Sequence, residues 1–496
     1  MSDDAVETEL KFLCEPADLP ALLDALPPPL PGAGERTAET LARYFDTPER
    51  DLRRARAGLR VRREPDGPVQ TLKQGSGFSR KEWEIPVEGD EPDLTHAPLA
   101  ELLDEAARQN LQSLFEVRVE RSKRTVAFEG AAIEVAIDQG EIRAGRRKRR
   151  LCEVELELKS GQIGDLFKLA RRLFEVAPLY LSFETKADQG FALAEGEDKT
   201  ARTHDQPGLT ADMTAAAAFQ ATMRASLAQI ASNGLVLRRA DAPDVLHQLR
   251  VAARRARSAL STFKPLFAED DRLDHLKAEL KWLAGACDEA RELDVFLAET
   301  YRPAAQTDAA IHGLADLGRA LEVARTKAHA KARAAVASSR FRALLLDVAE
   351  WAEAGAWLAG LEDGGGPAGD FAARALTHRR RKLEKKARDL TEISDAARHK
   401  ARIAAKKLRY AAEAFRPILK DKAARKLIKK TKKLQDALGA LNDAAVTEDL
   451  LTGLKLEGPA LYAAGHLAGE LAAGREQGLE AAAAAWKALK ACDDAW

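Results

Sequence analysis

Charged side chains alternate with apolar ones in a series of short segments spread over the first 190 residues. In the segment ETELKF, Glu7, Glu9 and Lys11 would share one face of a strand, because side chains two residues apart point the same way. In GLRVRRE, Arg60 and Arg62 share a face in the same manner. Carboxylates can hold divalent cations, and Arg and Lys can hold phosphates, so these faces could carry phosphate chemistry.

The same alternation recurs in further segments whose polar positions are almost all formal charges. A half-solvated antiparallel strand also alternates, but its polar positions usually include Ser, Thr, Gln and Asn. The further charged positions are Lys73, Arg80, Glu82, Glu84, Glu116, Arg118, Glu120, Glu134, Asp138, Glu153, Glu155, Glu157 and Lys159. The set favours a closed barrel that has charged side chains inside and apolar side chains outside, beneath helices.

Carboxylates gathered in one interior repel each other unless a cation lies between them. Mg²⁺ or Mn²⁺ is the natural cation for a site made only of oxygen ligands. Arg and Lys on the facing walls would suit a polyanion with several phosphates. Phosphoryl transfer needs no Ser, Cys or His nucleophile, because its catalysis rests on positioning and charge.

The ordered motifs resemble the CYTH superfamily, the triphosphate tunnel metalloenzymes. The Glu-x-Glu-x-Lys signature in ETELKF is followed, in the family's order, by YFDTPERDL, GLRVRR, TLK, RKEWE, EVAID, EVELELK and SFETK. The resemblance covers about 190 residues. It implies an eight-stranded antiparallel tunnel that hydrolyses or rearranges triphosphates with a divalent metal.

Carried over position by position, the resemblance implies two groups of residues. The implied metal ligands are Glu7, Glu9, Glu84, Asp138, Glu155 and Glu157. The expected catalytic set is Glu7, Glu9, Lys11, Glu155 and Glu157. The implied phosphate binders are Lys11, Arg60, Arg62, Lys73, Arg80, Arg118 and Lys186. Glu82, Glu153 and Arg124 are further candidate site residues without an assigned role. Mg²⁺ or Mn²⁺ is the implied cofactor, and inorganic triphosphate is the expected substrate.

From residue 214 onward the chain is rich in Ala, Leu, Lys and Arg with helical periodicity. HQLRVAARRARSALSTFKP (247–265) aligns without gaps to HKARIAAKKLRYAAEAFRP (399–417), 152 residues later. On a helix, one His and three cations of each copy fall within about 80° of one another. These two basic stripes are His247, Arg250, Arg254 and Arg257, and His399, Arg402, Lys406 and Arg409. A merely solvated face would carry Glu at i+4 for salt bridges, and the stripes contain none.

This repeat resembles the CHAD domain, which carries basic helices with His in two halves and accompanies CYTH domains. The resemblance implies two pseudo-symmetric four-helix bundles that bind inorganic polyphosphate. Lys277, Lys281 and Lys433 join the stripes as expected polyphosphate binders. Nucleic acid is disfavoured because base-stacking aromatics are scarce, Tyr410 being the main one.

The two halves of the chain carry opposite charge. Residues 1–200 hold 30 Lys and Arg against 39 Asp and Glu, a net charge of −9, and the remainder has +9. We expect a CYTH tunnel domain at 1–200, a linker at 201–213 and a CHAD domain at 214–496, with halves at about 214–362 and 370–496. The predicted fold class is α+β followed by all-α.

Four widely spaced cysteines without metal-ligand spacing fit a reducing compartment. We expect no signal peptide, since the first residues are acidic, and no membrane span, since no apolar run approaches about 18 residues. The cytoplasm is the expected location, with association with polyphosphate granules as an extension. The sequence predicts hydrolysis of inorganic triphosphate to pyrophosphate and phosphate. Two alternatives stay open: a non-catalytic polyphosphate scaffold or sensor, and a triphosphatase or cyclase acting on thiamine triphosphate or ATP.

Overall fold

The computed structural model describes residues 6–31, 34–64, 67–75, 79–197, 199–203, 207–267, 270–307, 311–473 and 475–496, and within these it describes only the backbone of residues 6, 7, 79, 80, 442–446, 472, 475 and 476. The chain forms two compact units. The first comprises the residues up to Arg202 together with Ala231–Ala240 and Ser338–Ala354, and the second comprises the rest. The predicted domain limits did not place these two later segments in the first unit.

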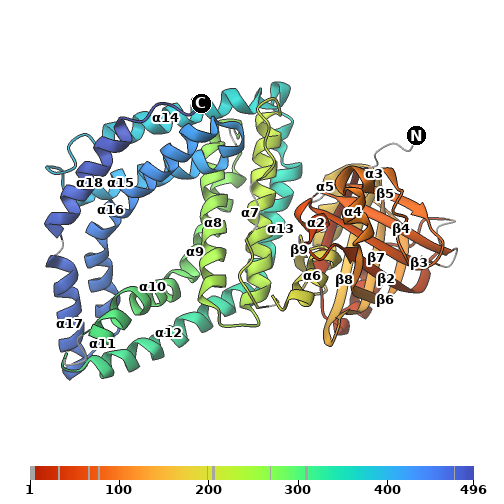
Figure 1. Cartoon of the computed structure of the whole chain (residues 1–496), viewed down its shortest axis with the longest axis horizontal. Helices are drawn as coiled ribbons and strands as arrows, with labels where there is room; N and C mark the ends of the chain where they lie inside the picture. Colours follow the sequence, from red (N-terminus) through yellow and green to blue (C-terminus); the bar gives the residue numbers. More distant parts are fainter. Residues whose placement is uncertain are drawn as a thin grey trace. The chain divides into compact units, whose positions relative to one another are not determined.

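The first unit is built on an antiparallel sheet that closes into a ring (Figure 1). Around the ring the strands follow the order β5-β4-β3-β2-β6-β7-β8-β1, and β5 pairs back with β1. They are β1 (Val6–Leu13), β2 (Arg36–Asp46), β3 (Ala57–Glu64), β4 (Gly67–Gln74), β5 (Ser79–Pro86), β6 (Gln112–Phe128), β7 (Ala131–Ala144) and β8 (Arg147–Ser160). A short β9 (Tyr180–Ser182) also pairs with β1. The predicted antiparallel barrel is confirmed.

Helices cover the apolar outer wall of the barrel, as the alternation predicts. Leu59 and Leu72 of the wall belong to one buried cluster with Leu52 and Leu99 from two short helices. On another side, Phe12 packs edge-on against Phe174 with ring centroids 5.5 Å apart. The covering helices are α1 (Leu19–Ala25), α2 (Asp51–Arg54), α3 (Ala97–Leu102), α4 (Glu105–Gln109) and α5 (Ile163–Phe174).

One end of the barrel interior is apolar and is filled by α6 (Lys186–Glu195). Phe115 of β6 stacks on Tyr44 with centroids 4.7 Å apart and meets Phe191 of α6 edge-on at 5.3 Å. Gly190 lies so close to this cluster that a Cβ there would be 2.0 Å from the Phe115 ring. The Thr185 side chain caps α6 by accepting a hydrogen bond from the Asp188 backbone N–H. Lys186 is therefore fixed as the first residue of the helix.

The second unit is helical (Figure 1). A similar succession of helices occurs twice along its sequence. α8 (Pro243–Thr262) and α15 (Asp395–Ala414) are the two copies of the repeat. The long α16 (Asp421–Gly453) follows α15 as α9 (Arg272–Ala286) and α10 (Asp288–Phe296) follow α8. The other long helices of this unit are α12 (Leu314–Ala337), α14 (Ala368–Lys386), α17 (Gly458–Ala473), α18 (Arg475–Lys490) and the part of α7 (Ala215–Leu237) up to Ile230, with α11 (Arg302–Thr307) a short one. The end of α7 and the whole of α13 (Ser339–Ala354) belong to the first unit. The predicted succession of a β barrel and a helical domain is confirmed.

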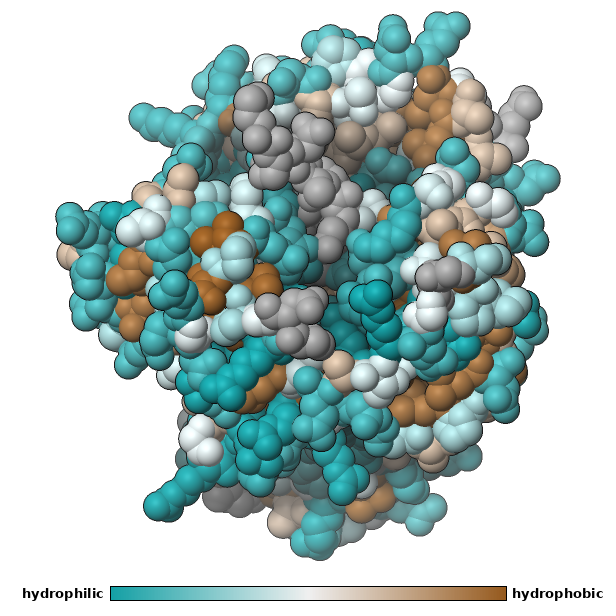
Figure 2. Space-filling model, turned by 90° about the vertical axis from the view of Figure 1, so that its right-hand side faces the viewer, coloured by the Kyte–Doolittle hydropathy of each residue, from teal (hydrophilic) through white to brown (hydrophobic). Residues whose placement is uncertain are grey.

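On the face shown in Figure 2, most side chains are hydrophilic and the hydrophobic ones form small separate groups. Among the described residues, no helix combines the length and the apolar character needed to cross a bilayer.

Candidate functional site: a charged barrel interior and a basic helix pair

Three carboxylates meet inside the barrel, namely Asp138 of β7 and Glu153 and Glu155 of β8. Each offers an oxygen that lies within 4.8 Å of the others. The ammonium of Lys186 lies 2.8 Å from one oxygen of each carboxylate. The three groups therefore share one point at which a cation is held. We call them the acidic cluster.

Two further cations surround the acidic cluster. Lys11 Nζ and Arg121 Nη2 each lie 3.0 Å from an oxygen of Glu155, and Arg121 Nε donates to Asp138 at 2.6 Å. Burial alone would raise the pKa of both Asp138 and Glu155, but Lys186 and Arg121 outweigh it and hold both pKa values below their ordinary range. Asp138 and Glu155 therefore stay ionised at neutral pH.

A second row of carboxylates lies next to the acidic cluster, two residues further along β8 from Glu155. The register places Glu9 opposite Glu157, and Glu157 opposite Glu134. Lys159 approaches Glu157 at 2.6 Å, and Lys123 approaches Glu134 at 2.9 Å. Two neighbouring rows of carboxylates thus line the wall formed by β1, β8 and β7.

Across the ring, β3, β4 and β5 supply cations and two more carboxylates. Lys73 lies 3.0 Å from Glu82, and Arg62 lies 3.6 Å from Glu84. The Nε atoms of Arg60 and Arg62 are buried and have no hydrogen-bond partner among the described residues. This wall therefore has donors left over for an anionic ligand.

The prediction for Arg118 is wrong. Arg118 is exposed and lies on the outer face of β6, while Arg121 and Lys123 of the same strand point inward to Asp138 and Glu134. Charges occupy both faces of β6, and its first inner positions are apolar because α6 fills that end of the barrel. The expectation that apolar side chains face outward therefore assigns the wrong face of β6 to the barrel interior. Arg124 also lies on the outer face, with Nη2 3.4 Å from the Leu23 carbonyl oxygen.

The structure brings together only part of the expected metal-ligand set. Asp138 and Glu155 meet, but their third partner is Glu153. Glu157 and Glu9 lie in the second row, and Glu84 accepts a hydrogen bond from Thr71 at 2.9 Å on the cationic wall. The side chains of Glu7 and Arg80 lie outside the described part of the chain.

The acidic cluster fits Mg²⁺ or Mn²⁺ by its donor chemistry. All its donors are carboxylate oxygens, which these hard cations prefer. The strands that carry them are adjacent and hydrogen-bonded, so the donors are held in place. The position of the Lys186 ammonium shows that all three carboxylates reach a common point. A divalent ion would compete with Lys186 for it.

In the second unit, both basic stripes lie on helices, α8 and α15, as the repeat predicts. Some of their cations have acidic partners that the sequence reading missed. Arg409 pairs with Glu413 at 3.1 Å, one turn along α15, and Arg250 pairs with Asp288 of α10. Lys277 pairs with Asp274 at 3.2 Å. His399, Lys281 and Lys433 are exposed.

Tyr410 connects the two stripes. Its ring lies 4.6 Å from the Arg409 guanidinium carbon and 5.9 Å from that of Arg254. Four buried polar atoms here have no hydrogen-bond partner within the described ranges: Arg254 Nε, Arg402 Nε, Arg409 Nε and the Tyr410 hydroxyl. Unpaired buried donors are costly, so this surface is suited to an anion.

His247 lies among cations from two helices. Burial, followed by Arg291, Arg254 and Arg250, lowers the pKa of His247. Arg291 of α10 was not among the predicted residues, because it lies outside the repeated segment.

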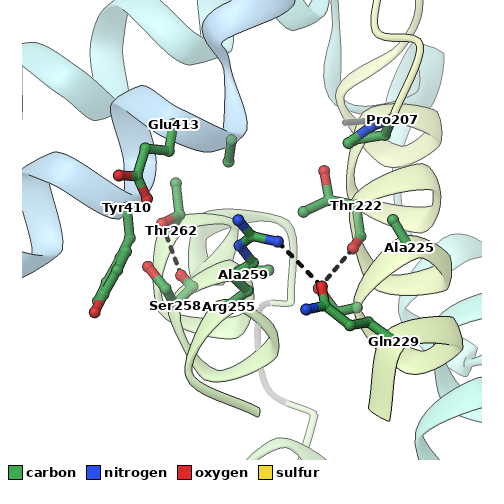
Figure 3. A pocket seen from close by; sticks show the side chains of 12 residues that line it. Pro207, Thr222, Ala225, Gln229, Arg255, Ser258, Ala259, Thr262, Tyr410 and Glu413 are labelled. Carbon is green, nitrogen blue, oxygen red and sulfur yellow. Dashed lines mark hydrogen bonds between the residues drawn. The ribbon is translucent and has the colours of Figure 1, made fainter. Parts of the chain in front are cut away.

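A pocket lies behind the stripes, between α7, α8 and α15 (Figure 3). It holds about 530 Å³ of empty space, solvent included. Arg255 crosses it and donates to Gln229 Oε1 at 3.1 Å, while Tyr410 and Glu413 form its far side. Tyr410, whose ring contacts Arg254 and Arg409 of the basic stripes, therefore also lines this pocket.

Comparison with known proteins agrees with this geometry. The CYTH domain family matches residues 5–191, and the CHAD domain family matches residues 221–452. An inorganic triphosphatase of Haemophilus influenzae is 36% identical over 158 residues, which are 30% of this chain and 44% of that protein. The match thus spans less than half of the relative's length.

Two solved structures are similar to parts of this chain. The CHAD domain from the plant Ricinus communis is 30% identical with a TM-score of 0.51, covering 59% of this chain and 97% of that one. PptA from Streptomyces chartreusis is 22% identical with a TM-score of 0.42, covering 55% and 100%. The chain carries a CYTH domain followed by a CHAD domain.

Proposed function

We propose that the barrel hydrolyses inorganic triphosphate to pyrophosphate and phosphate with Mg²⁺ or Mn²⁺. The observation that carries this proposal is the acidic cluster, since ionised carboxylates facing a cationic wall suit a metal-bound polyphosphate. A binding surface for anions alone would gain nothing from buried carboxylates, which repel the ligand. The triphosphatase named among the relatives supports the reaction class.

The residues of the two walls would have different roles, phosphate binding on one and metal binding on the other. Arg60, Arg62 and Lys73 would bind the phosphate oxygens and hold the chain of phosphates in line for attack by water. Asp138, Glu153 and Glu155 would hold the metal, which supplies charge neutralisation at the transferring phosphoryl group. Lys11 and Arg121 keep Glu155 ionised and oriented. Water then adds to a terminal phosphorus as the bridging P–O bond breaks.

A substrate panel tests this proposal. Phosphate release is measured from triphosphate, thiamine triphosphate and ATP, with Mg²⁺, Mn²⁺ or EDTA. We expect inorganic triphosphate to be preferred, because a site with charged walls recognises the phosphates and the CHAD domain is proposed to hold an inorganic polymer. Cyclic AMP formation, or a marked preference for an organic triphosphate, would contradict the choice of substrate.

We further propose that the helical domain binds inorganic polyphosphate across α8 and α15. The buried unpartnered donors of Arg254, Arg402 and Tyr410 support this. A long chain can reach both stripes, so it should bind far better than triphosphate. Binding should weaken steeply with salt, as counterion release requires. This ligand accords with a cytoplasmic protein associated with polyphosphate granules.

Polyphosphate binding is measured on the full chain carrying Glu155→Gln, so that turnover does not remove the ligand. Adding Arg254→Glu and Arg402→Glu should nearly eliminate binding. Arg319→Glu, at a side chain that is 72% exposed on α12, is the matched control and should change affinity little. Equal affinity for triphosphate and for a long polyphosphate would contradict the two-stripe surface.

A further inference from the structure

Two of the four widely spaced cysteines lie side by side in the structure. Cys14 follows the last residue of β1 and Cys152 lies in β8, 138 positions later. Their Sγ atoms are 3.3 Å apart, and the Cys14 backbone N–H donates to the Cys152 carbonyl oxygen at 3.2 Å. Sequence spacing gave no sign of this pair, because the contact depends on the barrel closing.

The strand register explains why these thiols meet. The β1–β8 ladder ends at the pair Leu13–Glu153, and one further step along it joins Cys14 with Cys152. Facing residues on antiparallel strands have Cα atoms roughly 4.5–5.5 Å apart, within the roughly 4.4–6.8 Å that a disulfide spans. Cys14 is partly exposed, so a small oxidant can reach it.

We propose that Cys14 and Cys152 form a reversible intramolecular disulfide that ties the end of β1 to β8. Along both strands the thiols alternate with Leu13 and Glu153, so they lie on the outer face of the wall whose inner face carries Lys11 and Glu155. The bond closes a long loop and removes freedom from the unfolded chain. It stabilises the wall that carries the acidic cluster without entering the interior.

A low-molecular-weight disulfide such as oxidised glutathione can serve as the oxidant that forms this bond by thiol–disulfide exchange. The Cys14 sulfur attacks that disulfide, forms a mixed disulfide and releases one glutathione thiol. The Cys152 sulfur then attacks the Cys14 sulfur and releases the second. Two electrons and two protons pass from the protein thiols to the small disulfide. Excess dithiol reverses both steps.

Peptide mapping of the wild-type full chain tests the bond directly. The protein is equilibrated in oxidised or reduced glutathione, its thiols are alkylated, and its peptides are analysed by mass spectrometry. We expect a Cys14–Cys152 linked peptide, about 2 Da lighter than the two thiol peptides together, only in the oxidised sample. Cys287 and Cys492, which are buried at separate places, should be alkylated after denaturation in both samples. Full alkylation of Cys14 and Cys152 in the oxidised sample would overturn the proposal.

Thermal unfolding tests the consequence. Oxidation should raise the Tm of the barrel by about 5 °C or more, and dithiothreitol should remove the gain. Cys14→Ser and Cys152→Ser should each abolish the difference, while Cys492→Ser should keep it. Turnover of triphosphate by the Cys14→Ser variant should match that of the reduced wild type. An unchanged Tm in a sample that contains the linked peptide would refute the stabilising role.

Discussion

At the residue scale, the acidic cluster depends on a balance between buried carboxylates and the cations that face them. Arg121 is central to this balance, because it contacts both Asp138 and Glu155. Arg118 lies three residues away on the same strand and faces outward, so the two arginines form a matched pair. Because one side chain points into the barrel and the other points out, comparing the two substitutions measures how much the inward-facing arginine contributes to activity.

We expect Arg121→Gln to lower kcat/KM for triphosphate by about 10²–10³-fold, because it removes one of the cations that hold Asp138 and Glu155 in place and disturbs the charged site. Arg118→Gln should change kcat/KM by less than about twofold. Steady-state phosphate release measures both, and Tm reports any loss of folding. Equal effects of the two substitutions would show that Arg121 has no special role.

Stability should depend on pH through the same carboxylates. The folded-state pKa values of Asp138 and Glu155 lie below their ordinary values of 3.8 and 4.5. A depressed folded-state pKa contributes stability above the unfolded value and loses it as pH falls through the folded value. The Tm of the barrel should therefore hold from pH 7 to about 5 and fall below about pH 4. Asp138→Asn should reduce this acid dependence, and an identical profile in that variant would contradict the assignment.

At the element scale, the sequence predicted most inner faces correctly. Alternation identified the charged faces of β1, β3, β4, β5 and β8, because each has charges on one face and apolar residues on the other. It failed for β6, where the chain has charges on both faces. It also could not show that α6 enters the barrel and presents Lys186, since that depends on packing between Phe115 and Phe191, which lie far apart in the sequence.

The fit of α6 can be tested at Gly190. A Cβ there would lie 2.0 Å from the Phe115 ring, so Gly190→Ala should push α6 outward. We expect a loss of about 1–3 kcal/mol in the free energy of unfolding and a lower kcat, because Lys186 moves with its helix. Gly469→Ala on α17, where the new methyl meets open space, is the control and should be neutral or stabilising by about 1 kcal/mol. Wild-type stability of Gly190→Ala would contradict this packing.

At the scale of the whole molecule, the two units arrange their charged side chains differently. The barrel sets its cations against ionised carboxylates, an arrangement that suits a metal-bound substrate. The helical unit leaves the Nε donors of Arg254, Arg402 and Arg409 unpartnered, an arrangement that suits a bare polyanion. Residues 1–200 and the remainder of the chain also carry opposite net charges, −9 and +9. Composition could suggest two tasks, but only the fold shows which carboxylates converge.

We propose that the acidic cluster is a catalytic site for triphosphate. The most direct measurement is ³¹P NMR of triphosphate incubated with the full chain and Mg²⁺ or Mn²⁺, comparing wild type, Glu155→Gln and Glu120→Gln. Glu120 is exposed on the outer face of β6 and serves as the control. We predict one phosphate and one pyrophosphate per triphosphate from wild type and Glu120→Gln, and a rate lower by at least about 10²-fold from a folded Glu155→Gln that still binds triphosphate. Wild-type turnover by Glu155→Gln, or no phosphate release by the wild type with either metal, would contradict it.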